Sequence, residues 1–159
     1  MAFFGKPKYS TVSVKAKDGV AKGIWTKCPE SGEMVFAKEL EKNLMVVPAS
    51  GYHFPLSAPK RIESLVDKGS FVEHDANLTS ADPLNFKGLA AYKDKLAQNK
   101  KKTKLNDAVV SGMAKMGGFP VSLAVMDFRF LGGSMGSVVG EKITRAIERG
   151  LEQKVPVII

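Results

Sequence analysis

The stretch that most constrains this chain runs from Asp127 to Gly140, where an apolar strand stops at paired glycines and an amphipathic helix follows. Glycine lacks a Cβ atom and reaches positive φ at little cost, so Gly132, Gly133 and Gly136 permit a tight turn that brings backbone within reach of another molecule. Free amides at a helix start favour anions. The turn therefore predicts a site for an acyl or phosphate group, although Gly-rich turns also close helices against sheets with no ligand.

The spacing of these glycines does not match the common nucleotide motifs. The four glycines between 132 and 140 do not form G-x-G-x-x-G, and no Lys-Ser or Lys-Thr pair follows them as in a P-loop. We therefore expect neither a nicotinamide cofactor nor a nucleoside triphosphate at this turn.

Composition is that of an ordinary globular protein. With 159 residues, 44% hydrophobic and 25% charged, the chain can bury about two-thirds of its unfolded surface in one main core. No apolar run approaches the roughly 20 residues of a membrane span, and the start, Met1–Lys6, meets a charge too early for a signal peptide. The single cysteine, Cys28, fits a reducing compartment. We expect a cytoplasmic protein without membrane contact.

The net charge of +8 indicates attraction to anions, with nucleic acid and phosphorylated cofactors as the two candidates. Much of the excess lies between Lys93 and Lys104, where crowded ammonium groups repel one another. We expect this tract to fray a helix end into a mobile loop. It forms either a solvated face or an anion contact.

Periodicity divides the chain into three parts. Residues 1–23 lack helical spacing and predict a flexible N-terminal arm. Residues 24–56 alternate short apolar pieces, at 24–27, 33–36 and 44–47, with Pro and Gly, and predict a small β-rich module. Such a module has too little core to stand alone, so it needs a metal, the main domain or a partner. The main domain is expected over 57–159.

The main domain is predicted to be of the α/β (α+β) class. Helices are indicated at 57–66 and 89–98, and a short strand at 71–73. A hairpin follows, with strands 108–113 and 121–126 around a turn at 115–120. After the glycine turn come a helix over 134–152 and a β-branched run over 155–159 of the kind found in buried parallel strands. The tail is therefore ββαβ and lacks a closing element.

This order of hairpin, FLGGSMGSVVG turn, helix and strand resembles the crotonase/ClpP-like ββα unit of biotin-dependent carboxyltransferases, and among them the β subunit of bacterial acetyl-coenzyme A carboxylase. Five segments carry the resemblance in the family's order: Ile24–Cys28, Glu39–Leu44, Tyr92–Leu96, Asp107–Val110 and Gly132–Gly140. It implies transfer of a carboxyl group from carboxybiotin on a carrier protein to acetyl-coenzyme A, which gives malonyl-coenzyme A for fatty-acid biosynthesis.

The resemblance also implies a substrate site. Gly132 and Gly133 give access to backbone, Ser134 caps the following helix, and Met135 contacts the acyl group or fills the core. Arg129 and the tract 100–104 are candidates for the coenzyme A phosphates. The predicted acyl-coenzyme A residues are Arg129, Phe130, Gly132, Gly133, Ser134, Met135 and Gly136.

Catalysis of this kind rests on amide dipoles that stabilise oxyanions, so it requires no nucleophilic side chain. This agrees with the sequence, because His53 and His74 have no triad partner nearby and are expected at the surface. No catalytic residue is assigned, since the family's Ser-Gly-Gly oxyanion turn is expected beyond Ile159. We predict that the chain alone is inactive, whether it is a fragment, a split subunit or a degenerate copy.

The family's N-terminal module is a zinc ribbon with two C-x-x-C loops, which supply four thiolates to a tetrahedral ion. Here Cys28 is the only cysteine, and Ser31, Val47 and Ser50 occupy the other three positions. One thiol and His53 cannot complete four ligands. We therefore expect no zinc and no other metal, with the module held by packing of Trp25, Phe36, Leu40 and Phe54.

Partners also follow from the resemblance. They are the carboxyltransferase α subunit, a second β subunit in an α2β2 assembly, and the biotin carboxyl carrier protein, with biotin carried by that partner and a coenzyme A thioester as substrate. An exposed apolar strand over 155–159 would also promote aggregation, so a partner or a further segment of chain is expected to pack against it. The alternative is a non-catalytic, truncated paralogue that docks a subunit or binds nucleic acid. Because the lysine tract contains no interleaved aromatic residue, only weak, non-specific nucleic-acid binding is expected.

Overall fold

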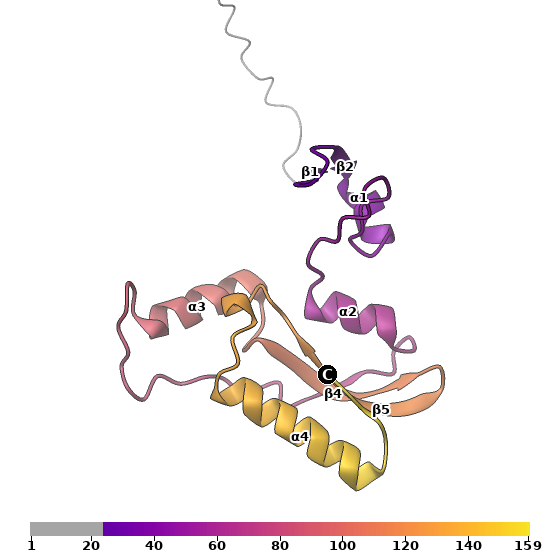
Figure 1. Ribbon diagram of the computed structural model, residues 1–159. Helices are drawn as coiled ribbons and strands as arrows, with labels where there is room; N and C mark the ends of the chain where they lie inside the picture. The colour runs from indigo at the N-terminus through magenta and orange to yellow at the C-terminus, as the bar shows by residue number, and fades with distance from the viewer. Residues whose placement is uncertain (1–23) are drawn as a thin grey trace, which may run out of the picture.

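The computed structural model describes residues 24–159, so the arm predicted over 1–23 lies outside the described residues (Figure 1). The elements are β1 (Trp25–Lys27), β2 (Met34–Phe36), α1 (Ala37–Lys42), α2 (Ala58–Leu65), β3 (Val72–His74), α3 (Tyr92–Thr103), β4 (Val109–Met116), β5 (Phe119–Met126), the 3-10 turn η1 (Leu131–Gly133), α4 (Ser137–Gln153) and β6 (Val157–Ile158).

A four-stranded sheet in the order β3-β4-β5-β6 forms the centre of the main domain. The first two pairings are antiparallel, and β6 joins β5 in parallel after the α4 crossover. The β4–β5 hairpin closes at Gly117 and Gly118, whose φ values of 59° and 85° suit a two-residue turn. Both amides donate to the Asp67 carboxylate. The predicted turn at 115–120 was therefore too long, because the strands pair up to Met116 and Phe119.

Helices α2 and α4 cover opposite faces of this sheet (Figure 1). Successive residues of a strand point to opposite faces, so Val109 packs toward α4 and Val110 toward α2. The cluster on the α4 side contains Leu96, Ala108, Val109, Ala124, Phe130, Val139 and Ala146. The cluster on the α2 side contains Ala58, Ile62, Val110 and Leu123. Burial on both faces explains the nearly continuous apolar runs of β4 and β5.

The small N-terminal module differs from the prediction in three respects. A six-residue helix, α1, occupies part of the region expected to be β-rich, and it buries Leu40. The strand predicted at 44–47 is absent from the described chain, because Leu44 and Met45 take positive φ and turn the chain back so that the Met45 amide donates to the Leu40 carbonyl. Trp25 is 48% exposed and packs at a tilt against the Phe36 ring, so it is not a core residue.

The lysine tract also differs from the prediction. Helix α3 continues through Lys100–Lys102 to Thr103, where the basic side chains meet the negative end of the helix dipole. Thr103 Oγ1 donates to the Asn99 carbonyl, and Lys104 ends the helix in the left-handed conformation. The expected fraying was wrong because these C-terminal contacts offset the repulsion between the ammonium groups.

Helix α4 approaches the sheet closely at Gly150. A Cβ atom at this position would overlap the Val157 side chain of β6, whereas one at Gly140, in the same helix, would meet no other atom. We predict that Gly150→Ala lowers the free energy of unfolding by about 1–3 kcal/mol through overpacking. Gly140→Ala should raise it by roughly 0.5–1 kcal/mol, because alanine restricts the unfolded chain.

Urea unfolding of the two variants beside the parent chain measures both changes. Both variants replace glycine with alanine in the same helix, so helix propensity alone would raise the urea midpoint of each. Equal urea midpoints for the two variants would contradict the close approach of α4 to β6.

Candidate functional site: the bend between β5 and α4

The bend between β5 and α4 contains a complete left-handed turn. Leu131, Gly132 and Gly133 have φ values of 47°, 67° and 71° in succession. Glycine adopts this conformation freely, whereas for a residue with a side chain it costs roughly 1–2 kcal/mol. The strain therefore lies at Leu131. Such strain persists where surrounding contacts impose it, and it is common at functional sites.

Three contacts hold the turn in place. Phe130, immediately before it, is 1% exposed and belongs to the core under α4. The Leu131 amide donates to Oδ1 of Asn99 on α3, at 3.1 Å. The Phe128 ring lies over Gly133, where a Cβ atom would come within 2.9 Å of Cδ1 of that ring. The backbone of the turn is therefore fixed from three sides.

The start of the bend is anchored by Asp127, whose side chain is fully buried. Its carboxylate accepts hydrogen bonds from the Ala58 amide (2.9 Å), the Arg129 amide (3.0 Å), and Arg129 Nε (2.9 Å) and NH2 (2.6 Å). Burial opposes ionisation of Asp127, but the hydrogen bonds from Arg129 and Ala58 outweigh it and hold the pKa of this carboxyl below its usual range. Asp127 thus ties the bend to the first turn of α2.

The end of the bend leaves backbone donors open. Helix α4 begins at Ser137 after Gly136, and no side chain caps it. Within residues 24–159, the amides of Met135, Ser137 and Val138 have no acceptor. The predicted cap at Ser134 was wrong, because the helix starts three residues later and the Ser134 amide instead closes the left-handed turn on Leu131. The uncapped amides and the helix dipole favour an anion or a polarised carbonyl here.

The seven predicted residues thus divide by position. Phe130 is buried and supports the turn from below. Four others are exposed on the bend: Gly132, Ser134, Met135 and Gly136. Met135 is 69% exposed, so the alternative that it fills the core is wrong. Gly133 is half-buried under Phe128, and Arg129 faces a cavity.

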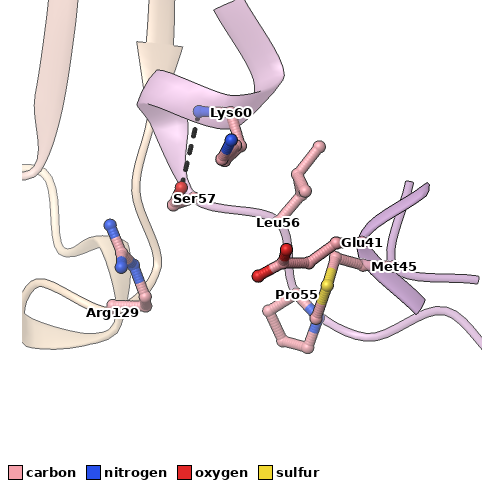
Figure 2. Close-up of a pocket in the computed structure, with 7 residues that line it drawn as sticks. All are labelled: Glu41, Met45, Pro55, Leu56, Ser57, Lys60 and Arg129. Atoms are coloured by element: carbon pink, nitrogen blue, oxygen red, sulfur yellow. Dashed lines mark hydrogen bonds between the residues drawn. The ribbon is translucent and has the colours of Figure 1, made fainter. Parts of the chain in front are cut away.

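That cavity, of about 310 Å³, lies between the bend, the start of α2 and the small module (Figure 2). Arg129 lines one side, Ser57 and Lys60 of the α2 start line another, and Glu41 and Met45 of the module lie opposite. Pro55 and Leu56 complete the lining. The wall therefore combines apolar surface with two cations, Arg129 and Lys60, and one carboxylate, Glu41. The local sequence of α2 gave no sign that Lys60 would face Arg129, which is 69 residues further along the chain.

Comparison with known proteins gives a consistent result. Residues 56–159 match the family described as carboxyl transferase domain, and residues 25–46 match the acetyl-CoA carboxylase zinc finger domain. The chain is 51% identical over its 159 residues to the acetyl-coenzyme A carboxylase carboxyl transferase subunit beta of Opitutus terrae, covering 54% of that protein. It is 48% identical to the subunit of the same name from Carboxydothermus hydrogenoformans, over 99% of this chain and 55% of that one. The chain thus spans about half the length of these relatives.

Solved structures agree on the fold. Transcarboxylase 12S, a hexamer solved with methylmalonyl-coenzyme A bound, matches with a TM-score of 0.50 and 25% identity over 65% of this chain and 18% of that one. A single-chain, multi-domain long-chain acyl-CoA carboxylase matches with a TM-score of 0.53 and 27% identity, over 65% of this chain and 10% of that one. The predicted crotonase-like, mixed α/β fold is confirmed.

We predict that Asp127→Asn lowers the free energy of unfolding at neutral pH by about 2–4 kcal/mol, because it removes a buried anion that accepts four hydrogen bonds. Since the pKa of Asp127 is lower in the folded state, its contribution is complete above the unfolded pKa of about 3.9 and is lost as the pH falls through the folded value.

Urea titrations of the parent chain and the variant at neutral and acidic pH measure this difference. Glu152→Gln, an exposed position with the same change of charge, is the control and should shift stability by less than about 0.5 kcal/mol. If the difference in unfolding free energy between Asp127→Asn and the parent chain stayed constant down to the lowest pH, Asp127 would not be the stabilising anion described here.

Proposed function

Since this chain belongs to the carboxyl transferase domain family, we propose that it forms the first part of the carboxyltransferase β subunit of a biotin-dependent acetyl-coenzyme A carboxylase. In this function the subunit receives the carboxyl group of carboxybiotin from a carrier protein and transfers it to acetyl-coenzyme A, which becomes malonyl-coenzyme A. The observation that carries the proposal is the uncapped start of α4 beside a strained turn, in a chain half identical to subunits of that name.

The bend is proposed to bind the acyl end of the substrate. The amides of Met135, Ser137 and Val138 have no acceptor within residues 24–159, so they can stabilise negative charge on a thioester oxygen at the start of α4. The exposed Met135 side chain provides apolar contact beside them. Gly132 leaves the backbone uncovered, since no atom lies where its side chain would be. These groups bind and orient the substrate, and none of them needs to exchange a proton.

The cavity next to the bend is proposed to take an anionic part of coenzyme A. Arg129 uses Nε and NH2 for Asp127, so this residue is held in position with its charge at the cavity wall. The Lys60 ammonium pairs with Glu63 at 3.0 Å, on the exposed surface where such a pair is weak. Lys60 is therefore available to a phosphate group. Lys100–Lys104 stay secondary candidates.

A complete active site needs further hydrogen-bond donors for the oxyanions of the reaction. We propose that these donors lie in residues outside this sequence. The α subunit, a second β subunit in an α2β2 assembly and the biotinylated carrier are the proposed partners, and the chain by itself is proposed to be inactive. We also propose the cytoplasm as its location and domain limits at 24–56 and 57–159. Over the described residues, the helices are too short or too polar to cross a membrane.

We predict that Gly132→Ala, made in the complete β subunit assembled with its partners, lowers kcat/KM for acetyl-coenzyme A by about 10- to 100-fold. Alanine at φ 67° strains the turn, and partial relief of this strain moves the amides at the start of α4. The matched control is Gly69→Ala, which has φ 75°, no atom near its Cβ position and a place far from the bend in the sequence.

Both variants should lose similar stability, about 1–2 kcal/mol, from the left-handed backbone. Malonyl-coenzyme A formation and thermal unfolding are measured on each. If Gly132→Ala is as active as Gly69→Ala, the bend is not part of the substrate site.

We predict that Lys60→Gln raises KM for acetyl-coenzyme A about three- to tenfold through loss of a charge-assisted contact with phosphate. KM for a short acetyl thioester that lacks phosphates should not change. Glu63→Gln is the control, because it releases Lys60 from its ion pair and keeps the cation. An equal increase in KM for both thioesters would show that Lys60 does not meet a phosphate.

A further inference from the structure

The small module contains one five-residue motif twice. Residues 28–32 read Cys-Pro-Glu-Ser-Gly and residues 47–51 read Val-Pro-Ala-Ser-Gly, so they differ at the first and third positions. Both segments form the same turn. The Gly32 amide donates to the Cys28 carbonyl at 2.9 Å, and the Gly51 amide donates to the Val47 carbonyl at 2.8 Å. Both glycines have φ of 72°.

The agreement between the two turns extends to their side chains and closing bonds. The residue after each glycine, Glu33 or Tyr52, accepts a hydrogen bond from the first residue of its turn. The Cys28 amide donates to the Glu33 carbonyl and the Val47 amide to the Tyr52 carbonyl, both at 2.8 Å. Each serine hydroxyl accepts from the amide two residues later, at 3.4 Å for Ser31 and 3.3 Å for Ser50. The two turns are therefore equivalent in backbone and hydrogen bonding.

The two turns meet at their first residues. Cys28 and Val47 are fully buried and share one apolar cluster with Val35 and Leu40. Ser50 Oγ lies 3.6 Å from Cys28 Sγ, and the Ser31 amide points at the same sulfur, at 3.5 Å. The zinc finger domain match over residues 25–46 contains the first turn, and the resemblance places the C-x-x-C positions of a zinc ribbon at the first and fourth residues of both turns.

The side chains at these positions do not fit a zinc ion. Structural zinc takes four thiolate or imidazole ligands, whereas this set offers one thiol, two neutral hydroxyls and the hydrocarbon of Val47. Burial opposes ionisation of Cys28, but hydrogen bonds from Ser31 and Ser50 outweigh it and lower the pKa of the thiol to about 7. Even as a thiolate, Cys28 is a single ligand. The part of the chain that the structure describes contains no group of three or more His, Cys, Asp or Glu side chains suited to a metal.

We propose that this module is a ribbon that folds without metal, in which burial of Val47 beside Cys28 and the hydrogen bonds of the two repeated turns replace the four zinc bonds. The turns keep the backbone geometry of the ion site, and hydrocarbon contact occupies its centre. The module then stays folded when zinc is scarce, and the cavity wall formed by Glu41 and Met45 stays in place.

The first test uses the full chain expressed in zinc-supplemented medium. Its metal content is measured by mass spectrometry, and its Tm is recorded with and without EDTA. The proposal expects far less than one zinc per chain and the same Tm in both buffers. Stoichiometric zinc whose removal by EDTA lowers Tm would overturn the proposal.

The second test restores the ligands with the triple variant Ser31→Cys, Val47→Cys and Ser50→Cys. Because the turns are already formed, this variant should bind one zinc per chain and acquire a Tm that EDTA lowers. The variant Val47→Ala should have a lower Tm than the parent chain and still contain no zinc. This measurement tests the role of the Val47 side chain even if the triple variant does not fold. A folded triple variant without zinc, or an unchanged Tm for Val47→Ala, would contradict the proposal.

Discussion

The buried carboxylate of Asp127 is the interaction on which the arrangement of the main domain depends. A charge removed from water is costly unless it is fully hydrogen-bonded, and here it has four donors, three from the nearby Arg129 and one from the distant Ala58. One donor is the Ala58 amide in the first turn of α2, so the anion also lies at the positive end of that helix. A single side chain thereby fixes the helix on one face of the sheet relative to the bend that leads to the helix on the other face.

The bend also determines which backbone amides at the start of α4 are left without an acceptor. A left-handed turn at Leu131–Gly133 changes the direction of the chain so that the helix begins without a capping side chain. Leu131 adopts an unfavourable backbone conformation, which is maintained by burial of Phe130 and by the hydrogen bond that the Leu131 amide donates to Asn99. Strain at the bend and open donors at the helix are therefore two results of one local geometry. That geometry is what the proposed substrate site depends on.

Local pattern was enough to predict the hairpin, α2, α4 and the parallel strand β6, because the helices have clear periodicity and the strands are apolar runs bounded by turn residues. Local pattern did not predict the features that depend on contacts between residues far apart in the sequence. Helix α1 has six residues and little helical signal, and it forms because Leu40 is buried in the module core. The contacts of Ala58 with Asp127 and of Asn99 with Leu131 join residues 69 and 32 positions apart. The glycines of the bend were visible in the sequence, whereas the residues that position them were not.

The small module and the proposed substrate site are connected through the cavity wall. Glu41 and Met45 face Arg129 across it, so the shape of the cavity depends on where the module holds α1 and the turn that follows. In a zinc ribbon four metal bonds would fix that position. Here the Met45 amide bonds to Leu40, and Leu40 packs in the same cluster as Cys28 and Val47. If the module folds without metal, as proposed, hydrocarbon contact replaces metal bonds in stabilising the wall, and the same residues still form it. On this argument the module contributes shape to the site, and its chemistry does not require an ion.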